Sequence, residues 1–384
     1  MRIGFDVSQT CASRAGCAWH ADSLAKSLSR IIGPENLVLY HHFGNWINHD
    51  TSSGTTIDGC ESPFRQYNVK EAKRIWNEIE SGNESLPGNP EIVHSNSFMA
   101  PSLKETPLVY TIYDLCFFTH PQYTTEENRQ FCSAEFNKAL EHASAFHFIS
   151  QTTLEVFNER YPNYLANSNK PFKVIHLAPR LSCNSSSKST VGPNAPWLFV
   201  GTIEPRKNIE GLLNAFEMYL KTSPKPRPLV IAGGKGWLSD SLHQRFDRLT
   251  KQGMFEYVGQ ISDNRLNKLY QESYAFLFPS HYEGFGLPVI EAMNFSLPVI
   301  SNDINSVREF AEGVATFVNF EDPSIVASKM VSLENNTTLY QKQSSHSKAT
   351  ASLLDWSITA AKLIPLYKAA ITYNENIRFS HPNN

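Results

Sequence analysis

Short apolar runs recur along this chain, and each is followed by a polar or glycine-containing loop and then by a stretch with helical spacing. This alternation predicts parallel β-strands joined by helices, because a parallel connection needs a crossover that is usually helical. The runs of the first series lie at residues 2–7, 37–40, 91–94, 108–112, 146–150 and 173–177. A second series begins afresh at residues 197–201, 229–232, 255–261, 275–278 and 297–302. The sequence therefore predicts an α/β protein with two Rossmann-like domains.

Length and composition support the same division. A chain of 384 residues exceeds what one hydrophobic core usually serves. Residues 182–196 are rich in Ser, with Pro and Asn, which is typical of a linker. We predict a first domain over residues 1–181 and a second over residues 197–353. An amphipathic helix is expected at 354–375, followed by an unstructured tail at 376–384.

One loop and the helix after it favour an anion site in the second domain. Gly284 and Gly286 would let the backbone take positive φ and approach a ligand closely, and Pro288 suits the first turn of a helix. Glu283 then lies in the loop, and Glu291 lies about one turn inside the helix. The helix start attracts phosphate, and the two carboxylates suit sugar hydroxyls. The alternative is that both glutamates lie on a solvated helix face.

The residues around Arg206 and Lys207 point to the same kind of ligand. The two cations precede a helix for which Asn208 is a good N-cap, and cations at that end oppose the helix dipole. They therefore need a negative partner, which a diphosphate supplies: arginine binds its oxygens bidentately and lysine acts as a point charge. An ion pair with Glu204 is the alternative, and it would leave one cation over.

Polar side chains at strand ends of the first domain are further candidates. His94, Asn96, Tyr113 and Asp114 follow predicted strands, and parallel sheets bind ligands at the carboxyl ends of their strands. Asp114 would orient sugar or acceptor hydroxyls, or else cap the next element. The long polar stretch 41–68 would be either an acceptor-sugar surface or a mobile surface loop.

The string from Glu204 to Asn208, together with Glu283 and Glu291 eight positions apart, resembles the retaining glycosyltransferases of family 4. The resemblance implies the GT-B fold, in which two Rossmann-like domains face each other across a cleft and the last helix returns to the first domain. It covers nearly the whole chain and is densest at 197–310. It also implies that the second half binds the nucleotide sugar and the first half the acceptor.

The resemblance assigns roles to particular positions. Glu283 would bind the donor sugar and Glu291 the ribose, main-chain groups near Val258 would frame the base, and Asp114 would orient hydroxyls. Contacts to the diphosphate are implied for Gly16, Arg206, Lys207, Gly284, Phe285, Gly286 and Leu287. Two positions depart from the pattern: Ala18 replaces a second glycine, and Tyr113 stands where many relatives have histidine.

Within this family the sequence looks most like bacterial mannosyltransferases of surface-polysaccharide assembly. This resemblance implies a nucleotide-sugar donor, with GDP-mannose as first choice and a UDP-hexose next. The acceptor would be a glycan or a lipid-linked saccharide. No Asp-x-Asp occurs in the sequence, which favours a route with no metal or other cofactor. A non-catalytic sugar-nucleotide-binding protein, a GT-B epimerase and a GT-B phosphorylase remain alternatives. A dehydrogenase is disfavoured because Gly16 stands alone where G-x-G-x-x-G is needed.

Composition excludes several other classes. A net charge of −3 gives no indication of nucleic-acid binding. The six cysteines include no C-x-x-C pair, so neither a disulfide framework nor a zinc site is indicated. No apolar run approaches the ~18 residues of a membrane span, and the N-terminus lacks a signal-peptide pattern. We therefore expect a cytoplasmic protein, which a lipid-linked acceptor would bring to the inner face of the membrane as a peripheral contact.

Overall fold

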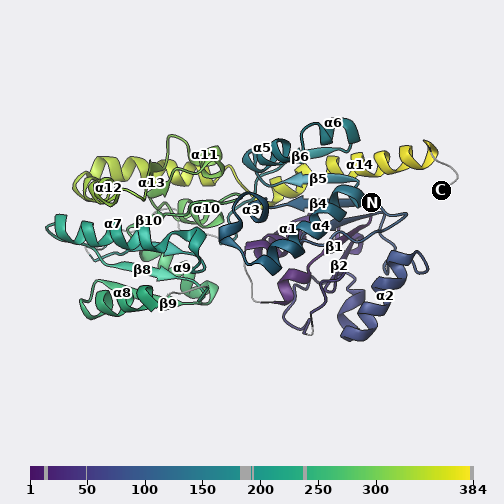
Figure 1. Cartoon of the computed structure of the whole chain (residues 1–384), viewed down its shortest axis with the longest axis horizontal. Coiled ribbons are helices and arrows are strands. Elements are labelled where there is room, and N and C mark those ends of the chain that lie inside the picture. Colours follow the sequence, from purple (N-terminus) through teal and green to yellow (C-terminus); the bar gives the residue numbers. More distant parts are fainter. Residues whose placement is uncertain (13–15, 49, 182–191, 193, 237–239, 381–384) are drawn as a thin grey trace. The chain divides into compact units, whose positions relative to one another are not determined.

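The computed structural model describes residues 1–12, 16–48, 50–181, 192, 194–236 and 240–380. The chain divides into two compact units, Met1–Arg180 with Asp355–Asn384 and Leu181–Leu354 (Figure 1). Our predicted domain boundary at residue 181 falls next to this division. Most of the predicted linker, residues 182–191 and 193, lies outside the described residues.

The first unit is built on a six-stranded parallel sheet with the order β2-β1-β3-β4-β5-β6. Its strands are β1 (Ile3–Asp6), β2 (Leu37–Tyr40), β3 (Ile92–Ser95), β4 (Leu108–Ile112), β5 (Ala145–Phe148) and β6 (Phe172–Val174). Its helices are α1 (Gly16–Ile32), α2 (Val69–Ser81), α3 (Cys116–Thr119), α4 (Glu126–His142), α5 (Gln151–Arg160) and α6 (Tyr164–Ser168). The strands interior to this sheet are buried throughout, as expected when helices cover both faces.

The last helix, α14 (Trp356–Ser380), packs on α1, β4 and β5 of the first unit. Its Tyr367 hydroxyl lies 2.7 Å from His94 Nδ1, and its Trp356 Nε1 donates to Pro179 O at 3.1 Å. The predicted return of the last helix to the first domain is thus observed. The predicted tail is wrong for residues 376–380, which are helical, while residues 381–384 lie outside the described part.

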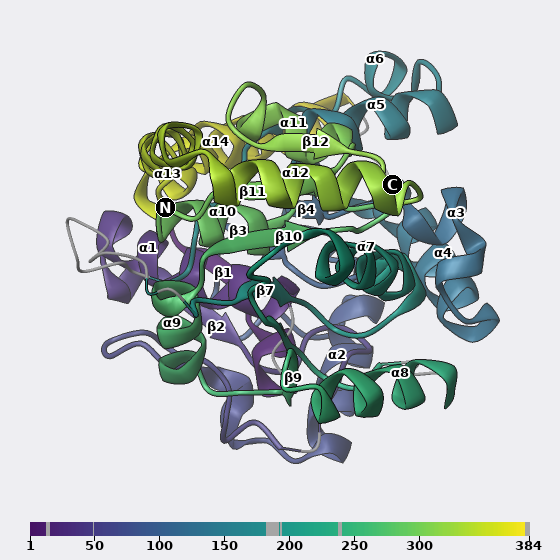
Figure 2. The ribbon, with the colours of Figure 1, turned by 90° about the vertical axis from the view of Figure 1, so that its left-hand side faces the viewer.

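The second unit repeats the architecture with the order β12-β11-β10-β7-β8-β9. Its strands are β7 (Trp197–Val200), β8 (Leu229–Ala232), β9 (Phe255–Gly259), β10 (Ala275–Phe278), β11 (Val299–Asn302) and β12 (Thr316–Val318). Its helices are α7 (Ile209–Thr222), α8 (Asp240–Lys251), α9 (Asp263–Glu272), α10 (Leu287–Asn294), α11 (Asn305–Ala311), α12 (Pro323–Asn335) and α13 (Thr337–Ala351). Helices α7 and α12 pack side by side (Figure 2). Two parallel sheets confirm the predicted α/β class.

Buried contacts join the described part of the stretch 41–68 to the rest of the first unit. His41 is buried, and its Nε2 lies 2.9 Å from Thr55 O. The Thr55 hydroxyl in turn donates to Asp22 of α1 at 2.7 Å. The carbonyl of His42 accepts from Trp76 Nε1 of α2 at 3.1 Å. Acceptor binding by this stretch stays a prediction.

Candidate active site

Arg206 and Lys207 lie in a single 3₁₀ turn, Pro205–Lys207, between β7 and α7. Pro205 at the start of the turn fixes its own φ and needs no N–H partner there. Asn208 ends the turn with φ of 50° and caps α7, because its side chain accepts from Gly211 N at 3.0 Å. The predicted N-cap at Asn208 is therefore confirmed.

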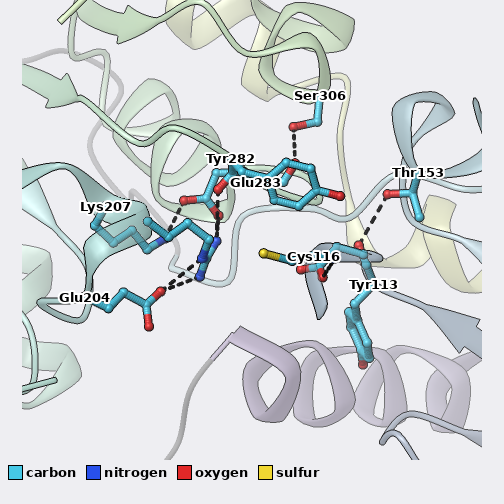
Figure 3. A network of polar contacts seen from close by, with 10 residues as sticks. Tyr113, Cys116, Thr153, Glu204, Lys207, Tyr282, Glu283 and Ser306 are labelled. Atoms are coloured by element: carbon cyan, nitrogen blue, oxygen red, sulfur yellow. Dashed lines mark hydrogen bonds and ion pairs between the residues drawn. The ribbon is translucent and has the colours of Figure 1, made fainter. Parts of the chain in front are cut away.

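The loop after β10 brings Glu283 to both cations (Figure 3). Arg206 Nη1 donates to Glu283 Oε2 at 2.7 Å, and Lys207 Nζ donates to Oε1 at 2.5 Å. The backbone of the loop is held as well, since His281 N donates to Arg206 O at 2.8 Å and Ser306 Oγ donates to Glu283 O at 2.7 Å. Two loops that leave neighbouring strands thus meet at one carboxylate.

The cluster is largely buried, with exposed fractions of 7% for Lys207 and 8% for Glu283. Burial alone would raise the pKa of Glu283, but the charges of Arg206 and then Lys207 lower that pKa to about 2. Glu283 is therefore ionised at neutral pH. Burial and the charge of Arg206 lower the pKa of Lys207, which Glu283 opposes.

Glu204 is the second carboxylate of this cluster. Its Oε1 accepts from Arg206 Nε at 3.1 Å and from Nη2 at 2.6 Å. The alternative that we drew from the sequence, an ion pair between Glu204 and Arg206, is thus present, and the remaining cation, Lys207, pairs with Glu283. Diphosphate binding by the two cations stays a prediction.

The start of α10 depends on Gly286. This residue is the N-cap with φ of 101°, and a Cβ placed on it would lie 2.9 Å from Val307 Cγ2. Only glycine fits such a position without strain. Gly284, in contrast, does not take a positive φ, so that part of our prediction is wrong. Phe285 is buried, with its ring centroid 4.9 Å from that of Phe310, and Leu287 begins the helix.

Glu291 lies inside α10 as predicted, and only 3% of it is exposed. Its Oε2 accepts from the Tyr270 hydroxyl at 3.1 Å, and the Tyr270 ring stacks on Phe295 at 5.3 Å. Because Glu283 and Glu291 are both buried, the alternative of a solvated helix face is wrong. Ribose binding by Glu291 stays a prediction.

Candidates of the first unit are held by protein contacts. Asp114 Oδ1 accepts at 2.9 Å from the N–H of Cys116, the first residue of α3, which is in keeping with our alternative that it serves the next element. The Tyr113 hydroxyl lies 2.6 Å from His20 Nδ1 and 3.0 Å from Asn96 O, and burial raises the pKa of Tyr113 far above its ordinary value. The Tyr113 carbonyl accepts from Thr153 Oγ1 at 3.4 Å (Figure 3).

His94 and Asn96 are wholly buried, which contradicts our expectation that they line a cleft. His94 sits between the Tyr367 hydroxyl of α14 and Thr111 Oγ1, at 2.7 Å from each. Asn96 contacts Asp6 through its backbone and side-chain nitrogens, each at 3.2 Å. Both residues therefore belong to the packing of the first unit.

The remaining candidates lie at element ends. Gly16 is exposed and begins α1, while residues 13–15 before it lie outside the described part. Val258 is half-buried near the end of β9 and is followed by Gly259 with φ of 65°. Sequence reasoning did not find Ser306 or the Tyr282 carbonyl, which accepts from Arg206 Nη1 at 3.1 Å. No local signal marks either, since both contacts join residues far apart in sequence.

No group of three or more His, Cys, Asp and Glu side chains in the described part of the chain is arranged to hold a metal ion. None of its helices combines the length and the apolar character needed to cross a bilayer.

Comparison with known proteins shows which families and structures the chain resembles. Residues 190–350 match the family described as Glycosyl transferases group 1. O-antigen chain mannosyltransferase B of Escherichia coli is 27% identical over 284 residues, which cover 72% of this chain and 74% of that protein. Serotype-specific mannosyltransferase WbdA of Escherichia coli is 36% identical over 171 residues, which cover 44% of this chain and only 20% of WbdA. The structure of HepE of Anabaena in complex with UDP-glucose matches with a TM-score of 0.68 and 17% identity, covering 96% of this chain and 100% of HepE.

Two parallel-sheet units match the GT-B fold, and the second carries paired cations at a buried glutamate ahead of a helix. Residues 190–350 resemble the Glycosyl transferases group 1 family, and the chain is similar to bacterial mannosyltransferases. Sugar transfer is the class of chemistry that these comparisons support.

Proposed function

We propose that this protein is a retaining, metal-independent hexosyltransferase that moves mannose from GDP-mannose to a glycan or a lipid-linked saccharide. The observation that carries the proposal is the convergence of Arg206 and Lys207 on Glu283, in the loop that leads into α10. Cations and a helix start together suit the diphosphate of a nucleotide sugar. Mannose is favoured because two relatives carry the name mannosyltransferase.

In this proposal the two cations and Glu283 act on different parts of the donor. Arg206 and Lys207 balance the charge that grows on the diphosphate as its bond to the sugar C1 breaks, and donors fixed in advance contribute roughly 10²–10³ each to such a rate. Ionised Glu283 accepts hydrogen bonds from sugar hydroxyls. The acceptor oxygen bonds to C1 on the face that the diphosphate leaves, and its proton passes to a phosphate oxygen. Retention of configuration follows.

The donor is tested by a thermal-shift panel of GDP, UDP and dTDP with their sugars, followed by nucleotide release from the donors that bind. We expect GDP-mannose to give the largest shift and to be turned over with acceptor present. The complex of HepE with UDP-glucose favours a UDP-hexose as second candidate, and a shift with UDP-glucose alone would select it. Binding without nucleotide release, with acceptor present, would indicate a non-catalytic binding protein.

Metal independence is tested in the same assay. We expect nucleotide release to continue in excess EDTA, because the leaving charge is met by side-chain cations and amide dipoles. Complete loss of activity that added Mn²⁺ restores would contradict this part of the proposal. A lipid-linked acceptor would further bring the protein to the inner face of the membrane, which flotation with acceptor-loaded vesicles tests.

A further inference from the structure

Glu204 has no role in the reaction scheme above, yet it holds one edge of Arg206. A single oxygen, Oε1, accepts from Nε at 3.1 Å and from Nη2 at 2.6 Å. The third guanidinium nitrogen, Nη1, faces the other way and donates to Tyr282 O at 3.1 Å and to Glu283 Oε2 at 2.7 Å. Two carboxylates from different loops therefore contact the guanidinium of Arg206 at different edges.

The edge that Glu204 holds is the one suited to phosphate. A guanidinium binds phosphate oxygens through a fork of parallel N–H groups, and Nε with Nη2 form such a fork. The side chains of Glu204 and Arg206 are 23% and 22% exposed, whereas those of Lys207 and Glu283 are 8% and 9% exposed. A solute therefore reaches the Glu204 edge before the inner pair.

The charges of the cluster point to the same edge of Arg206 as the diphosphate site. Two cations and two carboxylates give the cluster a formal charge of zero, counted as +2 from Arg206 and Lys207 and −2 from Glu204 and Glu283. A diphosphate adds at least two negative charges, and like charges in a partly buried site repel strongly. Moving Glu204 away from the guanidinium relieves that repulsion and opens the fork. Glu283 has no such freedom, because it is buried between both cations.

We propose that Glu204 is a competing carboxylate, which positions Arg206 through its Nε and Nη2 edge and must leave that edge for a diphosphate to bind. This inference rests on the proposed function. Glu204 therefore lowers the affinity for the diphosphate and speeds the release of the nucleoside diphosphate product.

The substitution Glu204→Gln separates this role from a structural one. Glutamine keeps an acceptor oxygen for Arg206 but removes the competing charge. We expect nucleoside diphosphate to bind about tenfold tighter, the effect of one partly screened charge interaction. The KM for the donor and kcat should both fall, because product leaves more slowly. If Glu204 only held Arg206 in place, nucleoside diphosphate would bind the variant equally well or more weakly, and the KM for the donor would not fall.

The experiment is calorimetric titration of the full chain with GDP and with UDP. Glu217→Gln is the matched control, because Glu217 is 28% exposed and pairs with Arg245 and Arg248 in the same unit, away from the cluster. Glu204→Asp, which shortens the side chain by one methylene, should give a smaller gain and serves if the Gln variant does not fold.

We expect the gain in the Glu204 variants and none in Glu217→Gln. Unchanged or weaker binding in Glu204→Gln, or an equal gain in Glu217→Gln, would overturn the inference while leaving the proposed function in place. A wild-type protein that binds neither nucleotide would overturn the proposed function itself, and the inference with it.

Discussion

The Lys207 ammonium donates to the Glu283 carboxylate at 2.5 Å, across a separation of 76 positions in the sequence. The loops that carry them leave β7 and β10, which are paired neighbours in the second sheet. Each side chain is buried, so each compensates a charge that would be costly alone. The sheet order therefore creates the cluster, and the cluster carries the proposed chemistry.

The first prediction concerns Lys207. We expect Lys207→Ala to lower sugar transfer by at least about tenfold at saturating acceptor, because the diphosphate loses one of its two cations. Arg206 still donates to Glu283 in this variant, so the fold should persist, which circular dichroism checks. Lys221→Ala, at an exposed position on α7, is the control. Unchanged turnover in folded Lys207→Ala would remove Lys207 from the diphosphate site.

The second prediction concerns pH. The pKa of Glu283 is about 2 in the folded protein and roughly 4.3 in an unfolded chain, a difference worth up to about 3 kcal/mol. A lowered folded pKa stabilises the protein above the unfolded value, and that stability is lost as pH falls from about 4.3 toward about 2. The unfolding free energies of wild type and Glu283→Gln, measured in urea, should therefore differ near neutral pH and converge on acidification. A difference in unfolding free energy that does not change with pH would contradict the lowered pKa of Glu283.

The third prediction concerns Gly286. We expect Gly286→Ala to destabilise the protein by roughly 1–3 kcal/mol, because the new Cβ meets Val307 and φ is positive. Gly253→Ala is the matched control, since Gly253 also has positive φ, 69°, but a Cβ there meets nothing within 4 Å. The difference between the unfolding free energies of the two variants, measured in urea, isolates the steric cost of the new Cβ. Equal losses of unfolding free energy would show that close packing at the start of α10 adds nothing to the cost of Gly286→Ala.

Much of this fold follows from local sequence, whereas most of the site does not. Apolar runs locate the strands. The N-cap at Asn208 and the helix start near Pro288 are also predicted by local sequence, and the structure agrees with both. Two carboxylates that pair with Arg206, Glu204 and Glu283, lie 2 and 77 positions away, and only the first is visible in a local pattern. Pairing across that distance depends on sheet order, which no spacing in the sequence records.

The same limit explains one of the errors in the first unit. His94 stands at a strand end, where a ligand contact is expected, but Tyr367 from a helix 273 positions later meets it and buries it. Residues 376–380 are expected from the sequence to be part of an unstructured tail, yet α14 continues through them with exposed side chains at 376–379. A long-range partner decided the outcome at His94.

The fourth prediction concerns the packing of α14. We expect Tyr367→Phe to lower the unfolding free energy by about 1–3 kcal/mol, because buried His94 Nδ1 loses its hydrogen-bond partner. Tyr373→Phe removes a hydroxyl of the same helix from a half-buried contact with Ser168 O, and should cost less. Urea unfolding compares the two variants. An equal or larger loss in Tyr373→Phe would contradict the importance of the buried contact.

The central claim, that Arg206 and Lys207 bind the diphosphate of a nucleotide sugar, is tested most directly by calorimetric titration of wild type and Arg206→Ala with GDP and GMP. We expect wild type to bind GDP at least about tenfold tighter than GMP, and we expect Arg206→Ala to lose most of this preference. An undiminished preference for GDP in folded Arg206→Ala would contradict the account.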